Sequence, residues 1–175
     1  MNYTISRIEV AQVCPTPFPH IYVSDVVEDG IYDRLVSSLN DGEYQTLDGL
    51  RHSRELDNWA RDLFLSPEIR ESLCRKFDCS GSTSSAVLVR DKKGFSIAPH
   101  ADAPGKVVTA LFYLPKNDLE DSGTEFYANG EVVNKFPFKR NSMLAFKVGP
   151  SSFHGLASFN HDTPRDLLLY YVSKP

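Results

Sequence analysis

The stretch HADAPGKVVTALFYL, residues 100–114, joins a candidate metal-binding motif to a candidate β-strand. In an extended segment alternate side chains point to the same side, so His100 and Asp102 can present a nitrogen and an oxygen to one point. The part that follows, residues 106–114, is rich in β-branched and aromatic side chains, which favours a strand. Together these features predict a strand that begins beside a metal site.

Short β-rich segments surround this strand throughout the second part of the chain. They cover residues 86–90, 94–97, 106–114, 124–128, 131–134, 142–148 and 166–172. Asn129-Gly130 separates two of them and is the typical sequence of a two-residue type I′ hairpin turn. Short strands with no helix between them predict a mainly β fold, either a sandwich or a barrel-like jelly roll.

The first part of the chain has mainly helical patterns. Ile5, Ile8 and Val10 roughly alternate and predict a strand over residues 3–13, which a proline-rich extended connector follows. Helices are then expected over residues 24–39, over 53–64 and from Ser66-Pro67 to Phe77. We expect these helices, in a support region of residues 1–80, to pack on the outside of a jelly-roll core of residues 81–175. The two parts together would form a single domain, residues 1–175.

The composition excludes several classes of function. Apolar residues make up 41% of the 175-residue chain and charged residues 24%, as in an ordinary globular protein. The 19 basic and 23 acidic residues leave a net charge of -4, so no nucleic-acid partner is expected. The longest apolar run is too short for a membrane span, and residues 1–10 lack a signal peptide's apolar region. The three cysteines form no C-x-x-C pair and favour a reducing compartment, so we expect a cytoplasmic protein.

A second histidine, His154, is a candidate partner for the His100-x-Asp102 motif. It lies near the start of a late strand, and a mostly antiparallel jelly roll can bring distant strand ends together. Two histidines and one carboxylate on one face of a metal form the facial triad of non-haem Fe(II) oxygenases. This triad leaves three coordination positions open, as a cosubstrate and dioxygen require.

The other histidines fit this role less well. His161 is the alternative second ligand, but it lies in the run 160–164, whose sequence is typical of a turn. His20 and His52 belong to the helical half, and no metal role is expected for them.

Several segments resemble the prolyl 4-hydroxylase-like branch of the Fe(II)/2-oxoglutarate-dependent dioxygenases. They are residues 100–114, Gly123-Thr124-Glu125-Phe126, Phe153-His154-Gly155, and Arg165 with the apolar strand 167–171. The resemblance covers roughly residues 84–172. It rests on the order of an H-x-D motif, a G-T-E-F element, a distal histidine and a following basic residue.

The resemblance implies a cupin-like double-stranded β-helix that binds Fe(II) through His100, Asp102 and His154. It also implies 2-oxoglutarate as cosubstrate, with its far carboxylate held by Arg165 through the two parallel hydrogen bonds that a guanidinium donates. Tyr113 matches a tyrosine that contacts the same carboxylate in close relatives. The implied reaction is oxidation of a substrate by O2, typically a hydroxylation, with release of succinate and CO2.

Some assignments stay open at this stage. Arg165 is alternatively a surface charge and Tyr113 a core side chain, and Arg90 and Lys106 are either substrate contacts or ordinary strand residues. The polar segment 41–52 is a candidate lid.

The pocket and the substrate are also undefined by sequence. Thr109 and Leu111 share a face with Tyr113 by alternation, so they either line the pocket or fill the core. Leu167 stands where many relatives have a small or hydroxylated residue, which leaves the shape of the oxoglutarate pocket open. The substrate is either a small molecule or a peptide side chain. The alternative functions are a non-catalytic metal-binding jelly-roll module and a cupin-type metalloenzyme of another class, which would use Zn2+ or Mn2+.

Overall fold

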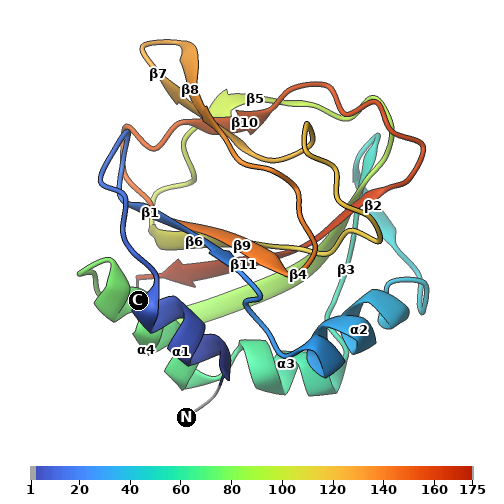
Figure 1. Cartoon of the computed structure of the whole chain (residues 1–175), viewed down its shortest axis with the longest axis horizontal. Coiled ribbons are helices and arrows are strands. Elements are labelled where there is room, and N and C mark those ends of the chain that lie inside the picture. The colour runs from blue at the N-terminus through green and yellow to red at the C-terminus, as the bar shows by residue number, and fades with distance from the viewer. Residues whose placement is uncertain (1–2, 175) are drawn as a thin grey trace.

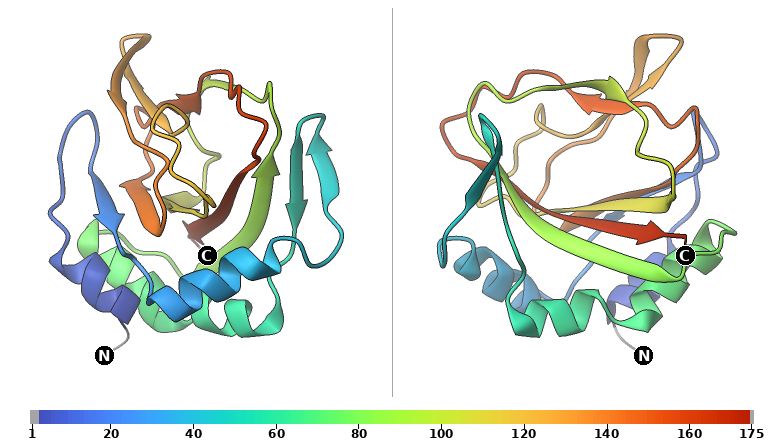
Figure 2. Two further views of the ribbon diagram at one scale, coloured as in Figure 1. Left: turned by 45° about the vertical axis from the view of Figure 1, so that its right-hand side comes forward. Right: turned by 180° about the vertical axis from the view of Figure 1, so that it is seen from behind.

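The chain folds into two facing antiparallel β-sheets with a layer of helices beneath the larger sheet (Figures 1 and 2), in a computed structural model that describes residues 3–174. The larger sheet has seven strands in the order β1-β9-β6-β11-β4-β3-β2, and the smaller has four in the order β5-β10-β7-β8. The two sheets form a double-stranded β-helix, or jelly roll, as the sequence predicts.

The elements have the following bounds. The helices are α1 (Tyr3–Val10), α2 (Asp29–Ser38), α3 (Asn58–Phe64) and α4 (Pro67–Lys76). The larger sheet contains β1 (His20–Ser24), β2 (Gln45–Asp48), β3 (Arg51–Arg54), β4 (Thr83–Asp91), β6 (Lys106–Tyr113), β9 (Ser142–Lys147) and β11 (Arg165–Ser173). The smaller sheet contains β5 (Ile97–His100), β7 (Glu125–Ala128), β8 (Glu131–Lys135) and β10 (His154–Leu156). Among residues 3–174, no helix is both long and apolar enough to cross a membrane.

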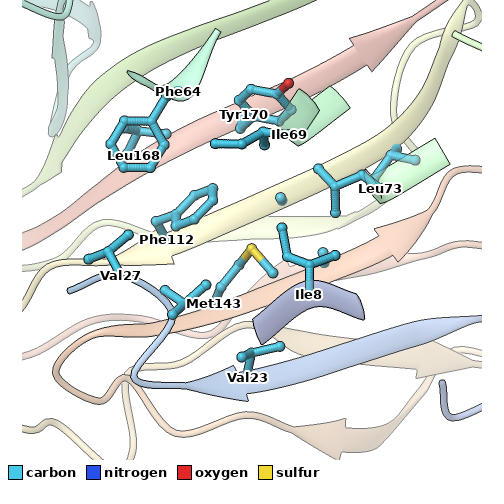
Figure 3. Close-up of a cluster of buried hydrophobic side chains, with 14 of the residues drawn as sticks. Ile8, Val23, Val27, Phe64, Ile69, Leu73, Phe112, Met143, Leu168 and Tyr170 are labelled. Atoms are coloured by element: carbon cyan, nitrogen blue, oxygen red, sulfur yellow. The ribbon is translucent and has the colours of Figure 1, made fainter. Parts of the chain in front are cut away.

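The central strands β6 and β11 are covered on both faces, which explains their nearly continuous apolar sequence. Phe112 and Leu168 are register partners and face the helices (Figure 3), where Phe112 packs edge-on against Phe64 at 5.1 Å between ring centroids. Their neighbours Leu111 and Leu169 face the space between the sheets. The larger sheet therefore has a structural core on one side and the cavity side on the other.

The N-terminal segment is a helix, and the expectation of a strand over residues 3–13 is wrong. Thr4, Ile5 and Ile8 are buried, whereas Val10 is exposed. That spacing of three to four positions follows the helical period. The helix packs beside α4 (Figure 1), so the side that Ile8 presents is buried between α4 and the sheet.

Two of the expected helices begin later than predicted because the preceding residues join the sheet or pack on it. Residues 20–24 form β1 along β9, and Asn141 fixes the backbone that follows by accepting from the Val27 N–H and donating to its carbonyl. Residues 51–54 form β3 along β4, so α3 begins at Asn58 rather than at Ser53. Helix α4 begins at Pro67, as its cap sequence predicts.

The strands predicted in the second part of the chain agree with the structure except at one place, and β10 is an additional short strand there. The segment expected at 94–97 is displaced to β5, because residues 92–95 form a turn in which Phe95 N–H donates to the Lys92 carbonyl. Asn129 and Gly130 both have positive φ values, of 53° and 82°, which is the backbone that a type I′ turn requires. The predicted β7–β8 hairpin is therefore confirmed.

Candidate metal and anion site

The three predicted metal ligands lie together at the ends of paired strands of the smaller sheet. His100 ends β5 and His154 begins β10, and the two residues are direct partners in the β5–β10 ladder. Asp102 lies in the loop that leaves β5. One ligand atom from each of the three side chains falls within 4.8 Å of the others. The H-x-D motif and the distal histidine therefore meet as the sequence predicts.

Hydrogen bonds to backbone carbonyls fix the orientation of both histidine rings. The Nδ1 atom of His100 lies 3.0 Å from the Ala98 carbonyl, and that of His154 lies 3.0 Å from the Ser152 carbonyl. Because a carbonyl only accepts, each Nδ1 carries the proton and each Nε2 keeps a free lone pair. Burial also lowers the pKa of His154 below its ordinary value, which favours the neutral ring that binds metals.

The Asp102 carboxylate is held by two donors. Lys106 Nζ lies 2.8 Å from Oδ1 and Thr109 Oγ1 lies 2.6 Å from Oδ2. Burial alone raises the pKa of Asp102, but these hydrogen bonds and the charge of Lys106 outweigh it, and the pKa lies below its ordinary value. Lys106 Nζ also lies 3.5 Å from the centroid of the Tyr171 ring. Lys106 therefore positions the acid of the triad.

Replacing Thr109 with valine removes one of these donors at nearly constant volume. We expect Thr109→Val to weaken Mn2+ or Fe2+ binding by about 10-fold or more, the usual effect of removing an outer hydrogen bond from a metal ligand. The affinity is measured by competition with a chelator. Thr83→Val, at an exposed position of β4, is the matched control and should bind the metal with parental affinity. Equal metal affinity in Thr109→Val and the parent would show that this hydrogen bond does not support the site.

Gly155 allows β10 to lie close to β5 at the metal site. A Cβ atom at this position would lie 2.7 Å from the Ile97 carbonyl oxygen. We expect Gly155→Ala to push β10 away from β5, to destabilise the fold by about 1–3 kcal/mol and to weaken metal binding. Thermal melting and metal titration measure the two effects. Gly30→Ala in α2, where a Cβ meets no atom within 4 Å, is the control. A Gly155→Ala protein with parental stability and metal affinity would refute this role.

A cavity of about 60 Å³ lies beside the triad. Outside the triad, its polar lining includes Arg51, Thr124 and Arg165, and its apolar lining includes Ile97, Leu111, Leu156 and Leu169. Thr109 and Leu111, which the sequence places on one face of β6, both line it. The cavity thus joins a candidate metal site to a cationic wall.

Arg165 is almost fully buried, and three groups fix its guanidinium. Nε donates to the Ser122 carbonyl at 2.8 Å, Nη1 donates to Asp91 Oδ2 at 2.7 Å, and Nη2 lies 3.4 Å from Thr124 Oγ1. Arg165 is therefore not a surface charge. It begins β11 and is aimed into the space between the sheets.

Sequence reasoning missed Arg51 and Asp91. Arg51 Nε and Nη2 donate to the two Asp91 oxygens at 2.6 and 2.9 Å, so Asp91 is shared by Arg51 and Arg165. The alternation of β4 was the available signal, since Asp91 follows the inward-facing Val89 by two positions. Two guanidinium groups and one carboxylate leave a net positive charge on the cavity wall, which favours an anionic ligand.

Tyr113 lies behind this wall. Its hydroxyl donates to Thr124 Oγ1 at 2.9 Å, and its ring packs against Phe138. Because Thr124 Oγ1 accepts from Tyr113 and faces Nη2 of Arg165, its own hydroxyl proton is free to point into the cavity. Tyr113 thus reaches the cavity through Thr124.

The remaining residues singled out from sequence lie elsewhere. Arg90 pairs with Asp166 at 2.7 and 3.1 Å and donates to the Leu39 carbonyl, away from the cavity wall. His161 pairs with the exposed Asp121. His20 packs among phenylalanines, and His52 contacts Thr46. The candidate lid, residues 41–52, contributes β2 and the start of β3 at the edge of the larger sheet, with Arg51 reaching the cavity.

Comparisons with known proteins reveal likeness in structure. No protein-family model and no curated protein matches the chain. A Pseudomonas putida prolyl-4-hydroxylase aligns with a TM-score of 0.75 at 12% identity, over 98% of this chain and 99% of the other. A Trichoplax adhaerens prolyl hydroxylase, solved with a peptide fragment of the hypoxia inducible factor oxygen degradation domain, aligns with a TM-score of 0.69 at 15% identity, over 98% and 88%.

HygX from Streptomyces hygroscopicus, solved with nickel and 2-oxoglutarate bound, aligns with a TM-score of 0.69 at 11% identity. The match covers 89% of this chain and 82% of HygX. The chain therefore shares its fold with these proteins, and the expectation of a prolyl 4-hydroxylase-like fold is confirmed.

Proposed function

We propose that this chain is an Fe(II)- and 2-oxoglutarate-dependent dioxygenase, an oxidoreductase of the prolyl 4-hydroxylase-like type. One observation carries the proposal: a His-Asp-His cluster and a net cationic wall line the same cavity. The fold shared with prolyl hydroxylases supports it. A cupin-type metalloenzyme without an anionic cosubstrate would not need a cationic wall beside its metal-binding residues.

The residues of the triad fit a divalent metal. His100, Asp102 and His154 would hold Fe(II), because both Nε2 atoms and a carboxylate oxygen are free to meet one ion. Two nitrogens and one oxygen on one face match the donor set of non-haem iron sites. The hydrogen bonds from Lys106 and Thr109 keep the carboxylate ionised and fixed.

The cationic wall fits the far carboxylate of 2-oxoglutarate. Arg165 would donate from its guanidinium, and Thr124 would donate its hydroxyl proton, which Tyr113 directs by bonding to the same oxygen. These donors are preorganised, since Ser122 and Asp91 already hold the guanidinium in place. When bound, iron and 2-oxoglutarate supply the oxidising power from O2, with release of succinate and CO2. Leu111 and Leu169 in the apolar lining would limit the access of water to the reacting groups.

The substrate class proposed is a peptide side chain or a small molecule that is hydroxylated. The Trichoplax adhaerens neighbour was solved with a peptide, and HygX has been solved with hygromycin B bound. Proteins of this fold therefore bind both peptides and small molecules. The cavity beside the triad is small, about 60 Å³, so a substrate would approach from its mouth.

Succinate formation tests the proposal. Metal-free protein is incubated in air with Fe(II) and isotopically labelled 2-oxoglutarate, and labelled succinate is measured by mass spectrometry. We expect slow succinate release in the absence of substrate that requires both Fe(II) and O2. The exposed-surface variant His161→Ala should release succinate at the parental rate. A folded, iron-loaded protein that releases no succinate over many hours would contradict the proposal.

A further inference from the structure

Asp91 is a buried carboxylate placed between two arginines. Its side chain is 0% exposed, while those of Arg165 and Arg51 are 2% and 17% exposed. Arg51 contacts both carboxylate oxygens, at 2.6 and 2.9 Å, and Arg165 contacts one, at 2.7 Å. The three side chains form one buried cluster, here called the Arg51–Asp91–Arg165 cluster, whose two arginines line the cavity.

The charge of this cluster depends on Arg51. With all three groups ionised the cluster carries one net positive charge, whereas Asp91 and Arg165 alone would form a neutral pair. A buried neutral ion pair has little attraction for an anion, because each charge is already compensated at short range. Arg165 can therefore attract a ligand carboxylate only if another cation balances Asp91.

Arg51 is well placed for that task. It begins β3, and its guanidinium lies over the Phe95 ring, 4.2 Å from the ring centroid, so a cation–π contact holds it in addition to Asp91. Its planar fork matches the carboxylate in a bidentate pair. Asp91, thus compensated, keeps Nη1 of Arg165 fixed while Nη2 faces Thr124 and the cavity.

We propose that Arg51 is a positioning residue that sets the charge of the anion subsite. By pairing with Asp91, it leaves the positive charge of Arg165 available for the far carboxylate of the cosubstrate. This inference rests on the proposed function, in which that cosubstrate is 2-oxoglutarate. It assigns a role in cosubstrate binding to the β2–β3 hairpin at the edge of the larger sheet.

The test compares two ligands and five proteins by calorimetric titration without O2. The ligands are 2-oxoglutarate and 2-oxopentanoate, which lacks the far carboxylate, and the proteins are loaded with Mn2+. Arg51→Met keeps the stem on Phe95 and removes the charge, and we expect it to bind 2-oxoglutarate about 10- to 100-fold more weakly. Its affinity for 2-oxopentanoate should not change. The affinity of Arg51→Lys for 2-oxoglutarate should lie between those of the parent and Arg51→Met.

The double variant Arg51→Met/Asp91→Asn gives the decisive comparison. Removing the carboxylate together with the arginine restores one net positive charge, so most of the lost affinity for 2-oxoglutarate should return. A merely structural role for Arg51 predicts no such rescue. Arg61→Met, at a half-exposed surface arginine of α3, is the matched control and should behave as the parent.

The outcomes separate this inference from the proposed function. Two results would overturn the role of Arg51 without affecting the proposed function, provided that the parent binds 2-oxoglutarate. One is an Arg51→Met protein that binds 2-oxoglutarate with parental affinity. The other is a double variant that binds 2-oxoglutarate as weakly as Arg51→Met does. A Mn2+-loaded parent that binds 2-oxoglutarate no better than 2-oxopentanoate would overturn the anion subsite itself.

Discussion

Replacing His154 with alanine is expected to abolish metal binding and, with it, turnover of 2-oxoglutarate. The variant would leave one histidine and one carboxylate, which cannot hold a divalent ion in the cavity. The loss should exceed the about 10- to 100-fold that outer hydrogen bonds to metal ligands contribute. Metal content after gel filtration and chelator competition measure it directly.

The fold should survive this change. The His154 ring contacts Phe146, a member of the apolar cluster between the sheets, at 4.7 Å between centroids. The larger apolar core lies on the other face of the larger sheet, against the helices. Circular dichroism would verify that the variant is folded. His161→Ala is the matched control, because that exposed histidine pairs with Asp121 and lies outside the triad. Parental metal binding by folded His154→Ala would remove His154 from the site.

Replacing Arg165 with methionine is expected to separate cosubstrate binding from metal binding. The affinity for 2-oxoglutarate should fall by about 10- to 100-fold or more, since a charge-assisted pair and the net charge of the wall are both lost. Metal affinity should stay near parental, because Arg165 does not contact the triad. Parallel titrations with Mn2+ and 2-oxoglutarate measure the two affinities.

The Arg165→Met protein is expected to fold, because Asp91 keeps a charged partner. Arg51 still pairs with both Asp91 oxygens in Arg165→Met, so no buried carboxylate is left without a partner. 2-Oxopentanoate, which lacks the far carboxylate, serves as the ligand control and should bind the variant and the parent equally. An Arg165→Met protein that binds 2-oxoglutarate as tightly as the parent would place the anion subsite elsewhere.

The jelly roll could be predicted because its strands carry strong local signals. Strand β6 is apolar except for Lys106 and Thr109, and Asn129-Gly130 fixes a hairpin by its positive φ values. The N-terminal part could not be predicted as well. Ile5 and Ile8 suit a strand or a helix over so short a segment, and only packing on α4 decides for the helix. The division of the chain near residue 80 stays a prediction.

In the candidate site too, the residues marked by local sequence patterns could be predicted, whereas those that depend on long-range strand pairing could not. His100 and Asp102 can be identified by the spacing of the H-x-D motif, and His154 by its position near the start of a predicted strand. The pairing of Arg51 with Asp91 depends on β3 lying beside β4, which no local pattern reveals. By sequence the polar segment 41–52 is only a candidate lid, whereas in the structure its Arg51 pairs with a buried carboxylate.

One anaerobic titration tests the proposed site most directly. Fe(II) is added to metal-free protein, followed by 2-oxoglutarate, and the visible spectrum is recorded. We expect a charge-transfer band from the iron–oxoglutarate chelate, and we expect His100→Ala to lose it. A folded, iron-loaded parent protein that shows no band on addition of 2-oxoglutarate would contradict the dioxygenase assignment.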